Sequence, residues 1–70
     1  MGVTDAVHVI PVDRTATWRV QEGDPRATIS EHLCENDAER AARVRARARG
    51  LERIVIHDRY HRTRELAAPR

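Results

Sequence analysis

The sequence lacks phenylalanine and lysine, and its 70 residues include only one tryptophan, one tyrosine and one cysteine. With so few large apolar side chains the chain can build only a small core. Such a core is worth about 3–5 kcal/mol, and dimerisation often supplements it in domains of this size. Trp18 is the largest apolar side chain available. A single cysteine excludes an intramolecular disulfide, which fits a reducing cytoplasm.

Long apolar runs are also missing. No stretch is long enough for a membrane span or a signal peptide, so the sequence predicts no membrane partner and a cytoplasmic location. Seventy residues make one domain at most. We expect a single domain over residues 7–65, with flexible termini at residues 1–6 and 66–70.

Positive charge comes from arginine alone and is unevenly distributed. Thirteen arginines against eleven acids give a net charge of +2. Residues 1–39 hold three arginines and eight acids, a balance of −5, whereas residues 40–70 hold ten arginines and three acids, a balance of +7. This asymmetry indicates either an anionic partner or attraction between the two halves, within the fold or across a dimer.

The longest periodic segment predicts a helix over residues 36–49. Asn36 is a good N-cap, and Glu39 lies three residues later, as in a capping box. Gly50 can adopt the left-handed conformation that ends a helix. We expect Leu33 to pack beneath the helix start and Cys34 to be a small apolar filler there.

The two faces of this helix differ. A thin apolar stripe is predicted to face the core, and it consists of Ala38, Ala41, Val44, Ala48 and Leu51. Arg40, Arg43 and Arg47 form the opposite stripe. That stripe is either a solvated outer face or a row of guanidinium groups placed for phosphates or an acidic partner.

Short β-branched segments predict the strands. The first covers residues 7–10 and ends at Pro11, with Val7 and Val9 on one face and His8 and Ile10 on the other. Three more follow at residues 17–20, 26–30 and 53–57, and residues 62–65 are expected to pair briefly as a short last strand. A turn is predicted at residues 58–61.

These elements predict an α+β domain of order β-β-β-α-β, in which one helix packs on one face of an antiparallel sheet of three to four strands. The other face of the sheet is then left uncovered. Ile10 and Val55 are candidates for that face. An uncovered apolar face on a small sheet favours a second copy of the chain as its partner.

Several of these segments recur together in a known family. They are residues 7–11 (VHVIP), residues 18–20 (WRV), Ala38 with the pair Ala41 and Ala42, Gly50, and residues 54–57 (IVIH) followed by a turn and a basic strand. In their order and spacing, residues 7–65 resemble the small bacterial family catalogued as domain of unknown function 2188. The resemblance implies the same order of elements and carries no activity with it.

Catalytic and metal chemistry have little support. The candidate metal ligands are His8, His32, Cys34, His57 and His61. None of their spacings matches a paired ligand signature, and His8 and His57 come near each other only if their strands are neighbours. There is no glycine-rich phosphate loop and no Ser-His-Asp pattern. We therefore expect no enzyme activity, no cofactor, no metal and no small-molecule substrate.

Two functions remain after these exclusions. The first is a non-enzymatic interaction module that self-associates through its sheet. The alternative is weak, sequence-independent nucleic-acid binding, in which arginines of the helix and the basic C-terminal half follow a phosphate backbone. The arginines predicted for that role are Arg40, Arg43, Arg47, Arg53, Arg62 and Arg64.

Overall fold

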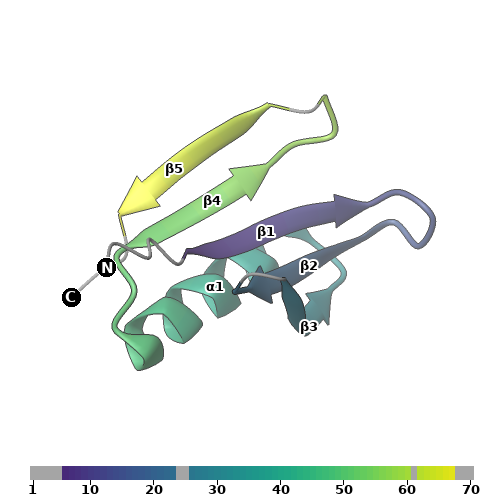
Figure 1. Ribbon diagram of the computed structural model, residues 1–70. Coiled ribbons are helices and arrows are strands. Elements are labelled where there is room, and N and C mark those ends of the chain that lie inside the picture. Colours follow the sequence, from purple (N-terminus) through teal and green to yellow (C-terminus); the bar gives the residue numbers. More distant parts are fainter. Residues whose placement is uncertain (1–5, 24–25, 61, 68–70) are drawn as a thin grey trace.

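A computed structural model describes residues 6–23, 26–60 and 62–67 of the chain, and it has an α+β fold with one helix on a five-stranded sheet (Figure 1). The elements in chain order are β1 (Val7–Val12), β2 (Thr17–Glu22), β3 (Ala27–His32), α1 (Glu35–Arg49), β4 (Arg53–His57) and β5 (Thr63–Ala67).

The predicted fold class and the order of the first five elements are confirmed, but the strand count is wrong. The residues after the last turn form a complete fifth strand, which pairs with β4 along its whole length. β5 reaches Ala67, two residues past the predicted end of the domain. Ala6, predicted to belong to the flexible N-terminus, is buried. The rest of the predicted tails, residues 1–5 and 68–70, lies outside the described residues.

The sheet is mixed, which corrects the antiparallel sheet predicted from the sequence. Its strand order is β3-β2-β1-β4-β5. β1 is antiparallel to β2 but parallel to β4, so that Val7 and Val9 lie beside Ile54 and Ile56. Parallel neighbours require a long connection. Here β2, β3 and α1 together supply it.

β1 continues through Pro11, where the sequence predicted its end. The ladder between β1 and β4 covers only Val7 to Val9, whereas the ladder to β2 continues to Val12. Pro11 therefore lies where β1 has a single neighbour, the situation in which a strand tolerates a proline as it does at a sheet edge.

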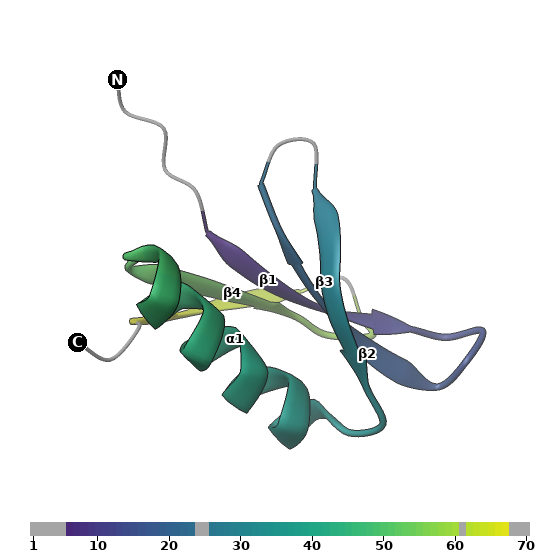
Figure 2. The same ribbon diagram turned by 90° about the horizontal axis from the view of Figure 1, so that it is seen from below.

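The core lies between α1 and one face of the sheet (Figure 2). Its largest fully buried side chains are Ile54, Ile56, Val7, Val9 and Val20, which come from the three central strands. On the helix side the core is completed by alanines. Small side chains let the helix approach the sheet closely. Because each alanine buries little area, the β-branched residues of the strands supply most of the buried apolar area.

The helix ends only partly match their prediction. α1 begins at Glu35 with Cys34 as its N-cap, and no side chain caps it, so the capping box of Asn36 and Glu39 is not formed. Cys34 is exposed rather than an apolar filler, and Leu33 is 85% exposed rather than packed under the helix. The predicted C-terminus is confirmed, because Gly50 is left-handed at φ 69°.

The helix is also rotated about its axis relative to the prediction. Ala38, Ala42 and Ala46 are fully buried, whereas Val44 is 65% exposed. Ala48, also predicted to face the sheet, is exposed. Ala38 was assigned correctly, and Ala41 and Leu51 pack at the margin of the core.

Glu22 fixes this rotation from the sheet. Its carboxylate lies at the end of β2, where it accepts hydrogen bonds from Arg45 at 2.5 Å and from Arg49 at 3.0 Å. The Glu22 side chain is only 10% exposed. These hydrogen bonds lower the pKa of Glu22 from its usual value, Arg45 contributing most. The negative and positive halves of the chain thus attract each other within the fold.

Candidate functional site

The sheet face turned away from α1 is the candidate site, and we call it the open face. Alternation along β1 places His8, Ile10 and Val12 there, opposite the buried Val7 and Val9. Its neighbour β4 adds Arg53, Val55 and His57. Within the described part of the chain no helix covers this face (Figure 2).

The middle of the open face is apolar. Val55 lies beside His8 in the register of the two parallel strands, and its exposure is only 9%. Ile10 is half-buried, although nothing from α1 reaches this side of the sheet. Both residues therefore lie where the sequence analysis expected them.

His8 and His57 are joined by a hydrogen bond in this central region. The Nδ1 atom of His8 lies 3.1 Å from the Nε2 atom of His57, and the ring centroids are 5.3 Å apart. The rings thus meet nearly head-on, and one nitrogen must donate while the other accepts. Their strands are neighbours, which is the condition that the sequence analysis set for the two histidines to come near each other.

The environment keeps this pair uncharged near neutral pH. Partial burial, followed by the positive charges of Arg26, His57 and Arg53, lowers the pKa of His8 to about 4. Burial, followed by Arg26, also lowers the pKa of His57. Both shifts disfavour the protonated ring, so the centre of the open face is neutral under ordinary conditions.

Two ion pairs flank the central region. On the β4–β5 side, Glu65 accepts hydrogen bonds from Arg53 at 2.7 Å and 3.3 Å. On the β2–β3 side, Arg19 lies 3.8 Å from Glu31, which also accepts a short hydrogen bond from the Thr17 hydroxyl. Each arginine on these flanks is thus matched by a carboxylate on the same face.

The arginines predicted for nucleic acid do not converge on one surface. Arg53 projects from the open face, whereas Arg40, Arg43 and Arg47 lie on α1, which covers the opposite face. Arg43 pairs with Glu39 at 2.8 Å. Arg40 and Arg47 are exposed and form no ion pair within the described residues.

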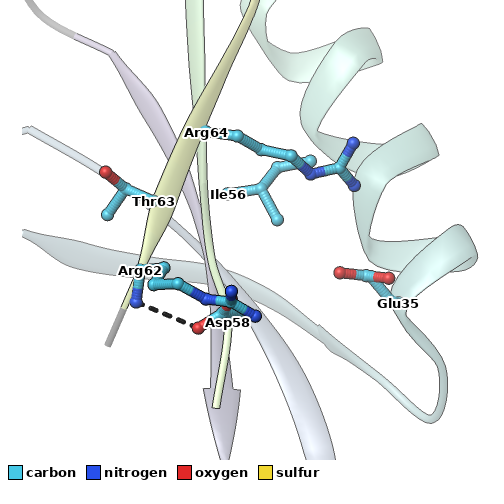
Figure 3. A pocket seen from close by; sticks show the side chains of 6 residues that line it. All are labelled: Glu35, Ile56, Asp58, Arg62, Thr63 and Arg64. Carbon is cyan, nitrogen blue, oxygen red and sulfur yellow. Dashed lines mark hydrogen bonds and ion pairs between the residues drawn. The ribbon is translucent and has the colours of Figure 1, made fainter. Parts of the chain in front are cut away.

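Arg62 and Arg64 belong instead to a small pocket of about 310 Å³ between β5 and the start of α1 (Figure 3). Arg62 pairs with Asp58 at 2.9 Å, and Arg64 reaches toward the helix, 3.8 Å from Glu39. The pocket is lined by Glu35, Ile56, Asp58, Arg62, Thr63 and Arg64. Two acids and two arginines line it, so the pocket has no strong charge of either sign.

The turn after β4 is built by Asp58. Its carboxylate accepts hydrogen bonds from the backbone amides of Tyr60 and Arg62, and these bonds lower its pKa, Arg62 contributing most. The predicted turn is confirmed for residues 58–60, and His61 lies outside the described residues. Tyr60 is 76% exposed, with the Arg62 guanidinium 5.5 Å from its ring centroid.

Metal binding and membrane insertion were each assessed on the described residues. Over residues 6–23, 26–60 and 62–67, no three side chains of His, Cys, Asp or Glu converge on a common point that could hold a metal ion. His32 instead bonds the Ser30 hydroxyl at 2.9 Å on the helix side of the sheet. The single helix of the described segments is too short and too polar to cross a bilayer.

Sequence reasoning missed two features of this molecule. The role of Glu22 was not predicted, because its position three residues before Pro25 gives no sign of a contact with the helix. The His8–His57 hydrogen bond depends on the parallel pairing of β1 with β4, which no local signal announces. The alternation of His8 and Ile10 with buried valines was the only available hint.

Comparisons with known proteins give no further guidance. No protein-family model, no curated protein and no solved structure matches the chain.

Proposed function

We propose that the chain is a small non-enzymatic interaction module that self-associates through the open face of its sheet. One observation carries the proposal: α1 covers a single face, and the other face has an apolar and uncharged centre formed by Ile10, Val55, His8 and His57. Such a centre resembles the interior of a protein interface more than an ordinary solvated surface.

The charges of the open face favour a second copy of the chain over an anionic partner. Arg19 and Arg53 are each matched by an acid on the same face, so much of its positive charge is balanced. The two ion pairs flank the central region on opposite sides. A twofold axis parallel to the strands would bring the Arg19–Glu31 side of one copy over the Arg53–Glu65 side of the other, an isologous arrangement.

The size of the chain supports the same occupant. A standard interface buries about 800 Å² on each partner, roughly a sixth of the 4933 Å² that the isolated chain exposes. A domain of this length buries only about 60% of its unfolded surface by itself, so the additional burial would contribute substantially to its stability.

The sheet edges are poorer candidates. In β3, Ser30 pairs with Val20 and Thr28 pairs with Gln21, so Ile29 has no register partner and interrupts the edge as a bulge does. Antiparallel pairing of β5 with its own copy, centred on its middle residue, would place Glu65 opposite Glu65. Like charges directly opposite each other destabilise a strand pair.

Sedimentation equilibrium at pH 7.5 tests the proposal. The parent chain is expected to be dimeric at micromolar concentration. Ile10→Glu places a charge on the open face and should give a folded monomer, with its fold checked by circular dichroism. Val44→Glu places the same charge on the exposed side of α1 and should remain dimeric.

Two results would contradict self-association through this face. One is a parent chain that stays monomeric throughout the high-micromolar range. The other is a Val44→Glu chain that dissociates while Ile10→Glu does not, which would move the interface to the helix.

A second candidate is weak binding of nucleic acid along α1, and one observation favours it. Arg40 and Arg47 are exposed, lie two helical turns apart and have no ion-pair partner within the described residues. We expect any such binding to be independent of sequence and to fall steeply with salt, because each phosphate contact releases about one counterion.

Titration of labelled duplex and single strands at low salt checks this alternative. Changing Arg40, Arg43 and Arg47 together to Gln should weaken binding and flatten its salt dependence. Arg53→Gln, on the opposite side of the molecule, is the matched control and should bind like the parent. Binding that ignores the triple change would remove α1 from consideration.

A further inference from the structure

We propose that self-association of this chain is controlled by pH through the hydrogen-bonded pair of His8 and His57 at the centre of the open face. This inference rests on the proposed function, because it assigns a regulator to the same surface. The two histidines lie near the middle of this face because they belong to β1, the middle strand of the five, and to its neighbour β4.

The geometry of the pair is compatible with one added proton but not with two. Two neutral rings need one N–H between their facing nitrogens, which lie 3.1 Å apart. A first added proton charges the pair while leaving this hydrogen bond in place. A second proton would set two N–H donors against each other, so the two sites titrate as a coupled pair.

The surroundings provide little to stabilise a charged pair. β2 contributes the neutral Gln21 opposite His8, and β4 contributes Arg53 on the same face. Arg26 adds further positive charge, which helps to lower the pKa of both histidines. The acids on this side already have partners. Glu65 is bonded to Arg53 and Glu31 to Thr17, while Asp13 and Asp58, which line a pocket beside His57, pair with Arg59 and Arg62.

Acidification would therefore charge the centre of the interface, while the acids on its flanks resist protonation. Glu31 and Glu65 have pKa values below their usual range, the former chiefly because of its hydrogen bond from Thr17 and the latter because of its hydrogen bond from Arg53. Both therefore lose their charge at a lower pH than an ordinary glutamate does. In a face-to-face dimer, each protonated pair meets its copy across the twofold axis, and like charges at a desolvated contact oppose association.

Sedimentation equilibrium at pH 7.5, 6.0 and 4.5, at constant ionic strength, tests the inference. The dissociation constant of the parent dimer is expected to rise at least tenfold between pH 7.5 and 4.5, while circular dichroism shows that the chain remains folded. The double variant His8→Gln with His57→Gln should lose this dependence on pH. His32→Gln and His61→Gln, which replace the other two histidines, should retain it.

The outcomes separate this inference from the proposed function. A parent that is dimeric with the same dissociation constant at pH 7.5 and 4.5 overturns the pH control and leaves self-association standing. A parent that is monomeric at pH 7.5 overturns both. A double variant that keeps the full response to pH overturns the assignment to His8 and His57.

If the double variant no longer associates, its response to pH cannot be measured, and a second measurement tests the inference instead. Nuclear magnetic resonance of the parent's imidazole nitrogens gives the titration midpoints of His8 and His57 directly. The midpoint for dissociation of the dimer should coincide with the first of these, below pH 6.5. Dissociation at a pH where neither ring titrates would overturn the inference.

Discussion

At the scale of single residues, one backbone position stores strain. Ala16 has φ 56°, in the left-handed region, at the end of the turn between β1 and β2, where its amide donates to the Asp13 carbonyl. A residue with a Cβ atom pays about 1–2 kcal/mol for this conformation, whereas glycine does not. The turn is therefore held in place by the strands that it connects.

Ala16→Gly is expected to stabilise the fold by about 0.5–1 kcal/mol, because relief of strain exceeds the entropy that glycine adds to the unfolded chain. Urea unfolding measures the change. Gly50→Ala is the inverse control. Its new Cβ atom meets nothing within 4 Å, so the left-handed φ of 69° is the only source of its expected loss. If Ala16→Gly destabilises the fold, strain at this turn is not significant.

Glu22 is the polar side chain on which the helix position most depends. Glu22→Gln keeps the shape of the side chain but removes the charge that Arg45 and Arg49 share. Hydrogen bonds to a charged group contribute about 1.5–3 kcal/mol when partly buried. We expect a loss of about 1–2 kcal/mol in the free energy of unfolding, measured by urea denaturation at pH 7.

The control for Glu22 is Asp37→Asn, which removes an exposed acid in the first turn of α1. Its expected cost is only a few tenths of a kcal/mol, the contribution of a charge to the helix dipole. Equal effects of the two changes would mean that Glu22 acts through overall charge rather than through its contacts with the helix.

At the scale of elements, the orientation of α1 gives a sharp prediction. Ala42→Glu introduces a charge and a longer side chain at a fully buried site and should cost about 3 kcal/mol or more in the free energy of unfolding. Val44→Glu, two residues away on the exposed side, should change stability by less than about 0.5 kcal/mol. Chemical denaturation of both variants checks the assignment, and similar losses would place the helix in another rotation.

The sequence predicted this helix but not its buried face, and the reason lies in its composition. Alanines and arginines alternate along α1, so the stripe of Ala41, Val44 and Ala48 is as apolar as that of Ala38, Ala42 and Ala46. Periodicity cannot choose between two stripes of similar hydrophobicity. The choice depends on a distant residue, since Glu22 draws Arg45 and Arg49 toward β2.

The positions of the strands along the sequence were easier to predict than which strands pair with each other. Residues 54–56 (IVI) are apolar on both faces, a pattern typical of a strand between two others, and β4 does lie between β1 and β5. Its parallel pairing with β1 was not predictable, because the direction of a neighbour depends on the path of the intervening chain. The sheet order had to be known before His8 and His57 could be assigned to each other.

At the scale of the whole molecule, ion pairs within the fold balance much of the uneven charge of the sequence. Acids of the first half pair with arginines of the second half, including Glu22 with Arg45 and Glu39 with Arg64. Counting charges along the sequence could not show whether the arginines form ion pairs within the fold or a surface that binds an external anion. Only Arg40 and Arg47 of the predicted set have no ion pair within the described residues.

Acid is expected to weaken the fold before the acidic residues begin to titrate. The pKa of His8 is about 4 in the folded chain against 6.5 as its ordinary value, so the unfolded state binds more protons between these limits. Stability is therefore complete above pH 6.5 and is lost as the pH falls toward 4. After allowance for solvent screening, we expect a loss of about 1 kcal/mol between pH 7 and 5.

Thermal melts at several pH values, at a concentration below that of dimerisation, measure this effect. For a domain of this size 1 kcal/mol corresponds to about 4–8 °C in melting temperature. The double variant His8→Gln with His57→Gln should melt at nearly the same temperature at pH 7 and 5. A parent whose melting temperature does not change over this range would show that the histidines are not shielded in the folded state.

The parallel pairing of β1 with β4 also determines when the chain can fold during its synthesis. β1, β2 and β3 are joined by short turns and can pair as soon as they leave the ribosome, but β1 then still lacks its other neighbour. That neighbour pairs Val7 with Ile54, across most of the sequence. Contacts of such wide separation form late, so the nascent chain would expose its apolar core residues until the ribosome has released β4.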